Sequence, residues 1–189
     1  MVPAPPGTLF SPHLTCSHLV ACNVDMDKMF TPKTVYVTYI VTTVEKLWAA
    51  ITSPELSREY FFGRSMESDW KIGSTFILRM EDGRVDSQGK VLECDPPRRL
   101  SVTWHVEWLE EYRHLPENLV TFQLDPLGEV VRLTMTESHQ EPIDDKILEG
   151  GRRGWPVILS GLKSLLETGS PLPFQGLGFG PSSKEPGRL

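Results

Sequence analysis

The side chains best suited to chemistry lie close together near the middle of the chain. They are His105, Glu107, Glu110, Glu111 and His114. Imidazole and carboxylate groups could form an acid–base pair or a metal site, and a strand would place residues 105 and 107 on the same face. The alternating apolar residues Val102, Trp104 and Val106 would occupy the inner face of this strand, so we expect the two polar residues to face solvent. We therefore predict no catalytic residue, no metal site and no cofactor.

Two glycine-rich segments have phosphate-binding character. Gly176, Gly178 and Gly180 match part of a dinucleotide pattern, but without a preceding strand or a following helix they indicate only low complexity. The segment GGRRG at 150–154 stands near an expected helix start, where free N–H groups and two arginines could bind an anion. The alternative is that Gly154 lets the helix approach the sheet closely. The signatures of common hydrolases, P-loop proteins and zinc proteases are absent from the sequence.

Composition restricts the function classes further. The 189 residues are 39% hydrophobic and 23% charged, and the net charge of -6 argues against a nucleic-acid partner. No apolar run reaches the roughly 18 residues of a membrane span. Cys16, Cys22 and Cys94 are an odd number without a C-x-x-C pair, which indicates a reducing compartment and hence the cytoplasm. We interpret Cys94 as an apolar filler at a strand end rather than a nucleophile.

The two ends of the chain differ from its middle. Residues 1–24 contain no Lys, Arg, Asp or Glu and resemble neither a secretory signal nor a mitochondrial presequence. We expect residues 1–30 to form a flexible extension, and translation from near Met29 would explain it. Residues 169–189 contain five Gly and four Pro, which predicts a disordered tail. One domain, residues 31–168, lies between them.

Hydrophobic periodicity predicts the elements of this domain. Residues 33–41 alternate as a strand, with Val35, Val37 and Tyr39 on one face. Short helices at 44–51 and 54–63 follow capping residues, and the second has Pro54 at its first position. Strand patterns then run over 64–68, 74–80, 84–94, 99–108, 118–125 and 129–138.

A leucine-striped helix ends the domain at Gly169. Since Pro156 is compatible with the first turn, we expect this helix to begin near Arg152 or Arg153, with residues 143–150 forming a separate turn. Short connections predict antiparallel strands, and the last helix is the one element long enough to cover the sheet. The fold class is therefore α+β, a twisted sheet of about seven strands curled around the C-terminal helix, with a cavity between them.

Several segments carry a family resemblance over residues 33–168. They are TVEKLWAAITSPELSREYFFG, DWKIGSTF, GKVLECDPPRRLSVTWHVEW and RRGWPVILSGLKSLLETG. This sequence resembles the SRPBCC superfamily of helix-grip proteins, also called START-like or pollen-allergen-like. Within it, the chain is most similar to the group named for homology to the C-terminal domain of the activator of heat-shock-protein chaperone ATPase. The resemblance implies a helix-grip fold with a cavity under the last helix.

We predict that this cavity binds a small hydrophobic molecule. The predicted ligand-binding residues are Tyr60, Phe61, Phe76, Met80, Trp104, Phe122, Met135, Trp155 and Leu159. We expect Tyr60 and Phe61 at the mouth and Trp104 deeper. One alternative is a chaperone-accessory or regulatory interaction protein, monomeric or homodimeric, which would have a filled core and an exposed apolar patch. Another is a cyclase-like or hydrolytic enzyme, which would direct two or more titratable groups inward.

Overall fold

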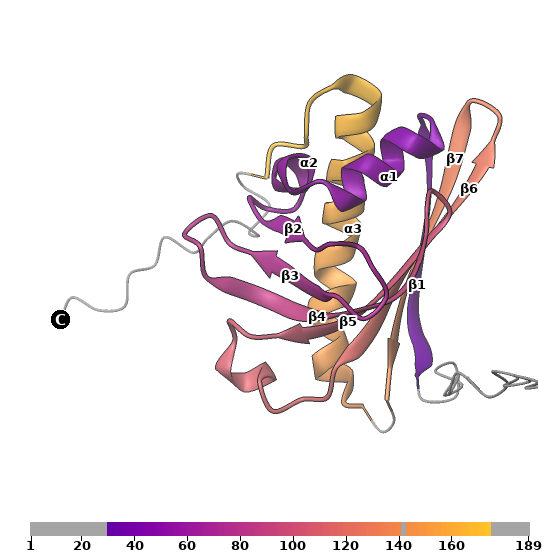
Figure 1. The fold of residues 1–189 in the computed structure, drawn as a ribbon. Helices are drawn as coiled ribbons and strands as arrows, with labels where there is room; N and C mark the ends of the chain where they lie inside the picture. The colour runs from indigo at the N-terminus through magenta and orange to yellow at the C-terminus, as the bar shows by residue number, and fades with distance from the viewer. Residues whose placement is uncertain (1–29, 141–142, 175–189) are drawn as a thin grey trace, which may run out of the picture.

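The computed structural model describes residues 30–140 and 143–174 as a single sheet that holds a long helix (Figure 1). The strands are β1 Thr31–Val41, β2 Ser65–Glu67, β3 Thr75–Arg79, β4 Val85–Asp95, β5 Arg99–Val106, β6 Asn118–Leu127 and β7 Val130–His139. The helices are α1 Val44–Thr52, α2 Pro54–Tyr60 and α3 Asp145–Thr168, with a 3-10 turn η2 at Glu110–Tyr112. The predicted α+β helix-grip fold is confirmed.

The sheet is antiparallel in the order β1-β7-β6-β5-β4-β3-β2. Strand β1 is at one edge because α1 and α2 separate it from β2, and it pairs with β7 instead. Lys163 of α3 donates to the Tyr39 carbonyl, and Glu167 accepts from the Val41 N–H at 2.8 Å. These bonds occupy part of the β1 edge and tie the end of α3 to it, which protects backbone groups that would otherwise be open to pairing.

The two short helices form where the sequence predicts them. Thr43 caps α1 by accepting from the N–H of Lys46, and Ser53 caps α2 by accepting from the N–H of Leu56. Both side chains satisfy backbone donors that have no partner within their helix. In Figure 1 the two helices lie near the C-terminal end of α3, while the segment between β5 and β6 lies near its start.

The last helix begins earlier than predicted. Asp144 caps it by accepting from the N–H of Lys146, and it continues to Gly169, which takes the left-handed conformation. Pro156 therefore lies inside α3, and the expected start near Arg152 is wrong. A proline removes one backbone bond and clashes with the carbonyl four residues earlier, but burial of an apolar face stabilises a helix by more than one bond. Residues 145–150 belong to this continuous helix, so the separate turn predicted for residues 143–150 is wrong as well.

The core lies between the concave face of the sheet and the buried face of α3. Ile40, Leu124, Leu133, Met135 and Leu162 are among its least exposed side chains. The predicted stripe of Val35, Val37 and Tyr39 lies on the opposite face of β1, where each of the three is more than half exposed.

The predicted domain limits stay a prediction. Residues 1–29 and 175–189, which make up most of the predicted extension and tail, lie outside the described residues. The described part of the tail contains Phe174, whose ring centroid lies 4.8 Å from that of Phe62. Contacts with the domain thus extend beyond residue 168. None of the helices in the described ranges is long and apolar enough to cross a membrane.

Candidate functional site

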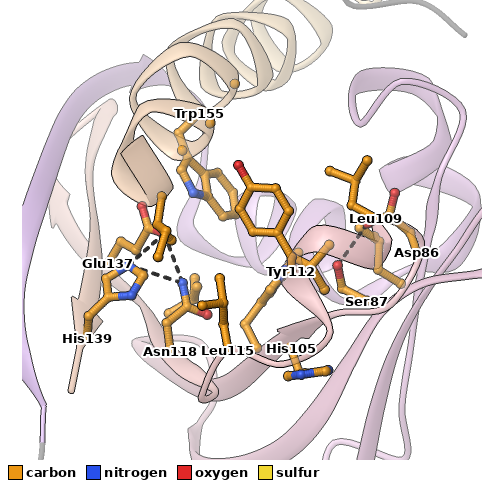
Figure 2. Close-up of a pocket in the computed structure, with 18 of the residues that line it drawn as sticks. Asp86, Ser87, His105, Leu109, Tyr112, Leu115, Asn118, Glu137, His139 and Trp155 are labelled. Carbon is orange, nitrogen blue, oxygen red and sulfur yellow. Dashed lines mark hydrogen bonds and ion pairs between the residues drawn. The ribbon is translucent and has the colours of Figure 1, made fainter. Parts of the chain in front are cut away.

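A cavity of about 330 Å³ lies between the first half of α3 and the concave face of the sheet. Strands β5, β6 and β7 form its floor, α3 forms one wall, and the segment 107–117 between β5 and β6 covers it from the other side. Figure 2 shows Tyr112 of that segment over the cavity beside Trp155, with Leu109 and Leu115 to either side of Tyr112. The volume is within the range of small-molecule sites.

Aromatic side chains form the inner end of the cavity. The Trp155 ring lies edge-on to Phe61 at 5.7 Å and to Trp104 at 5.6 Å, and Phe61 stacks on Trp104 at 6.1 Å. These centroid distances and tilts are those at which aromatic pairs attract beyond their area of contact. The three residues come from the end of α2, from β5 and from α3, so the cavity wall forms only when these elements have packed together.

The mouth lies at the opposite end from the one predicted. Tyr60 and Phe61, expected at the mouth, are only 2% and 5% exposed, and the Tyr60 hydroxyl donates to the carbonyl of Ala50. Trp108, which lines the cavity from the β5–β6 segment, is 46% exposed. Gly150 of α3 is also exposed and lines the cavity. The opening is therefore between the β5–β6 segment and the first turns of α3.

One wall of the cavity is polar. Glu137 and His139 continue the inward face of β7 beyond its buried apolar residues, and both are less than 10% exposed. Glu137 Oε1 accepts from Asn118 Nδ2 at 2.8 Å and lies 3.1 Å from His139 Nε2, while Oε2 accepts from Thr34 at 3.1 Å. The same His139 Nε2 lies 3.5 Å from Asn118 Nδ2, so the three side chains form one connected cluster. Figure 2 shows this cluster gathered at one side of the cavity.

A second polar group lies across the cavity from the first. Asp86 and Ser87 of β4 stand on the other side of Tyr112 in Figure 2. The Asp86 carboxylate accepts from Arg64 Nε and, at 2.8 Å, from the Ser87 hydroxyl. Its carbonyl accepts from the N–H groups of Glu107 and Trp108, which fixes the start of the covering segment. Asp86 thus forms an ion pair with Arg64, and its backbone carbonyl holds the start of the covering segment in place.

The glycines of α3 shape the other wall. Gly150, Gly151 and Gly154 lie inside the helix, so their N–H groups are not at a helix start and the anion-binding interpretation is wrong. A Cβ on Gly151 would stand 2.4 Å from Glu137 Oε2, whereas one on Gly154 would have nothing within 4 Å. The helix therefore approaches the sheet closely at Gly151, and Gly154 leaves open space in the cavity. The Tyr36 hydroxyl donates to the Gly151 carbonyl at 3.3 Å, and burial raises the pKa of this phenol.

His105 and Glu107, the strongest acid–base candidates in the sequence, hold the covering segment. The His105 Nδ1 lies 3.1 Å from Glu107 Oε1, and its Nε2 lies 3.2 Å from the Arg113 carbonyl. A hydrogen bond from Gln88 lowers the pKa of Glu107, followed by a smaller contribution from His105. His105 is among the residues that line the cavity, and in Figure 2 its ring is directed away from Tyr112 and Trp155.

The remaining candidates form no site. Glu110 and His114 are exposed and do not line the cavity, and the side chain of Glu111 lies outside the described residues. In the ranges that the structure describes, no three His, Cys, Asp or Glu side chains gather as metal ligands would. Cys94 is half-buried, and burial raises the pKa of its thiol with a further contribution from Asp95, which makes it a poor nucleophile near neutral pH.

Three of the nine predicted ligand-binding residues line the cavity: Phe61, Trp104 and Trp155. The others that are buried in the core without lining it are Tyr60, Phe76, Phe122, Met135 and Leu159. Met80 is half-buried just after β3 and is not part of the lining. The structure thus brings three of the predicted residues together at the cavity and places five others in the core.

Sequence reasoning missed Glu137 and His139. The signal was present, because Val131, Leu133 and Met135 alternate as the inward face of β7 and residues 137 and 139 continue the same phase. A charged residue in phase with a buried strand face indicates either the end of the strand or a polar group in a cavity. The covering segment was also missed, since it has no periodicity.

The comparisons with known proteins assign the fold to a family. The model of the family described as activator of Hsp90 ATPase homolog 1-like protein matches residues 41–167. The chain belongs to this family. The comparison with curated proteins gives no match. The matched residues include the aromatic wall, Glu137, His139 and most of α3, so the cavity lies within the family domain.

Solved structures share the fold of this family member. MLL2253 from Mesorhizobium loti is 28% identical, with a TM-score of 0.58 over 70% of this chain and 96% of that one. CalU16 from Micromonospora echinospora is 22% identical, with a TM-score of 0.60 over 76% and 84%. The Aha1 dimer from Colwellia psychrerythraea is 21% identical, with a TM-score of 0.57 over 71% and 96%. The last two identities support the fold alone.

Proposed function

We propose that this protein binds a small, mainly apolar molecule in the cavity under α3. The observation that carries the proposal is the 330 Å³ of space bounded by Trp104, Trp155 and Phe61 and left open by Gly154. Side chains normally fill a space of this volume in a protein core, because the side chains around an empty space lose van der Waals contacts.

Glycine inside α3 supports the same proposal. Each mid-helix glycine costs about 0.5 to 1 kcal/mol relative to alanine. At Gly154 there is room for a side chain, so packing with the sheet does not require glycine there. A glycine at this position would instead keep space free for a ligand.

Filling the cavity tests the proposal. Gly154→Leu should abolish binding of an apolar fluorescent probe such as naphthylmethanol, followed through quenching or energy transfer from Trp104 and Trp155. Ser160→Leu, on the exposed face of the same helix, is the matched control and should bind normally. Binding should bury apolar area worth about 25 cal/mol per Å² and show a negative heat-capacity change. Equal affinity in the two variants would refute a ligand site in the cavity.

A second candidate function is that of a chaperone-accessory protein, and the outer face of β1 favours it. Val35, Val37, Tyr39 and Val41 alternate there and are 51–60% exposed, which is an apolar stripe of the kind that docks on a partner. The family is described by its likeness to an activator of Hsp90 ATPase. Stimulation of a chaperone ATPase by the full chain, lost in Val37→Lys and kept in Gly154→Leu, would support this candidate over ligand binding.

A further inference from the structure

The charges around the cavity indicate which ligands it selects, an inference that rests on the proposed binding function. Two carboxylates, those of Asp86 and Glu137, line the cavity, but no Lys or Arg does among the residues described. Arg64 pairs with Asp86 from outside the lining. A ligand inside the cavity therefore meets acceptors and negative charge, without a cation to receive an anionic group.

Unlike Asp86, Glu137 forms no ion pair with a Lys or Arg side chain among the described residues. Its hydrogen-bond partners among the described residues are the neutral groups of Asn118 and Thr34 and the imidazole of His139. Oε1 accepts two of these bonds and Oε2 accepts one, and Oε2 also lies close to α3 at Gly151. The residue is 6% exposed, and in such surroundings charge acts more strongly than in water.

The aromatic wall acts in the same direction. Trp104 and Trp155 lie within the cavity lining, and the faces of indole rings attract cations. A ligand carboxylate would have to lose its water close to another carboxylate, which costs free energy, and no Lys or Arg in the described lining offsets this cost with an ion pair. An ammonium group would instead be attracted by the carboxylate of Glu137, and a hydroxyl group would carry no charge for that carboxylate to repel.

We propose that the cavity selects apolar molecules bearing an ammonium group or a neutral hydrogen-bond donor, and rejects molecules bearing a carboxylate or phosphate, with Glu137 as the determinant. Fatty acids and phospholipids are therefore outside its ligand class. Uncharged aromatic alcohols and aromatic or alicyclic amines are inside it.

Three probes with one apolar body test this selection: naphthylmethylamine, naphthylmethanol and naphthoate. Titrations at about pH 8 keep the amine and the carboxylate charged while free imidazole is neutral. The amine should bind at least as tightly as the alcohol, and naphthoate should bind about tenfold more weakly or worse. In Glu137→Gln the disadvantage of naphthoate should shrink to about threefold or less.

A second variant avoids the buried hydrogen-bond cluster, in case Glu137→Gln does not fold. Ile147 is half-buried, lines the cavity and lies on the first turns of α3, so Ile147→Lys adds a cation near the mouth. This variant should tighten naphthoate and weaken the amine. Ile147→Gln is its uncharged control and should keep the order of the parent protein.

The outcomes separate the two proposals. If naphthoate binds as tightly as the alcohol, and Gly154→Leu blocks both, the charge selection is refuted while ligand binding stands. If no probe binds, or all bind Gly154→Leu as well as the parent protein, the binding function itself is refuted. If the order is as predicted and Ile147→Lys reverses it, both proposals are supported.

Discussion

Truncation of Trp155 tests the packing of α3 on the sheet, which is what creates the cavity. The side chain is 6% exposed and contacts Phe61, Trp104 and Phe122 at ring centroid distances of 5.6–6.1 Å. Aromatic side chains bury 150–250 Å², so at about 25 cal/mol per Å² the apolar burial is worth about 4 to 6 kcal/mol. Three aromatic pairs add about 0.5 to 1.5 kcal/mol each.

The measured loss should be smaller than this total. Trp155 lines an existing cavity, so the space left by Trp155→Ala joins an opening to solvent, and the unfolded chain already buries part of the indole. We expect Trp155→Ala to lower the free energy of unfolding by about 3 to 5 kcal/mol, the usual range for a buried large aromatic. Urea unfolding followed by circular dichroism measures this loss.

The matched control is Trp108→Ala, because Trp108 is 46% exposed at the mouth of the same cavity. Its loss should be below about 1 kcal/mol. A loss below about 1 kcal/mol for Trp155→Ala as well, with an unchanged denaturant slope, would refute the reasoning that this residue anchors α3.

The remaining predictions concern two glycines and one tyrosine. Gly154→Ala should raise the free energy of unfolding by up to about 1 kcal/mol, because it adds helix propensity where there is space. Gly151→Ala should lower it, since its Cβ displaces the Glu137 carboxylate from its hydrogen bonds, and equal thermal midpoints for the two variants would contradict this contrast. Burial raises the pKa of Tyr60 well above its ordinary value of 10.0. Above about pH 10 the unfolded chain therefore releases this proton while the folded protein keeps it. The free energy of unfolding should then decrease with rising pH, by up to about 1.4 kcal/mol per pH unit. Tyr60→Phe should flatten that fall, and an unchanged pH dependence in urea unfolding would show that Tyr60 is not its source.

The inward pair of Glu137 and His139 gives the enzyme alternative a specific test. Glu137 and His139 both face the cavity, as expected of an acid–base site, although their hydrogen bonds to each other and to Asn118 are also those of a binding wall. A turnover activity lost in both His139→Ala and Gly154→Leu, with naphthylmethanol still bound by His139→Ala, would favour catalysis in the cavity over binding alone.

Sequence alone predicted the elements with strong periodicity. Seven strands, two short capped helices and a final helix follow from alternation, from Thr43 and Ser53 as caps, and from the apolar stripe that ends at Gly169. The predicted start of α3 was wrong because the proline rule is local, whereas the burial of Leu148 before Pro156 and of Ile158 after it, which stabilises the helix on both sides, is a tertiary effect.

The site was less predictable than the fold. Periodicity identifies an inward residue but not whether it meets a neighbour or an open space, so Phe122 and Trp104 looked alike in sequence although only Trp104 lines the cavity. The polar wall joins Thr34, Asn118 and Glu137 across as many as 103 positions of sequence. Such a cluster depends on strand register, which short-range patterns do not determine.

The most direct measurement of ligand binding in the cavity is the chemical shift of the five tryptophan indole N–H groups while naphthylmethanol is added. Trp104, Trp155 and Trp108 line the cavity, and Trp48 and Trp70 do not. We predict saturable shifts of the first three resonances and unchanged positions of the other two. Shifts confined to Trp48 and Trp70, or none at all at saturating probe, would contradict a ligand site under α3.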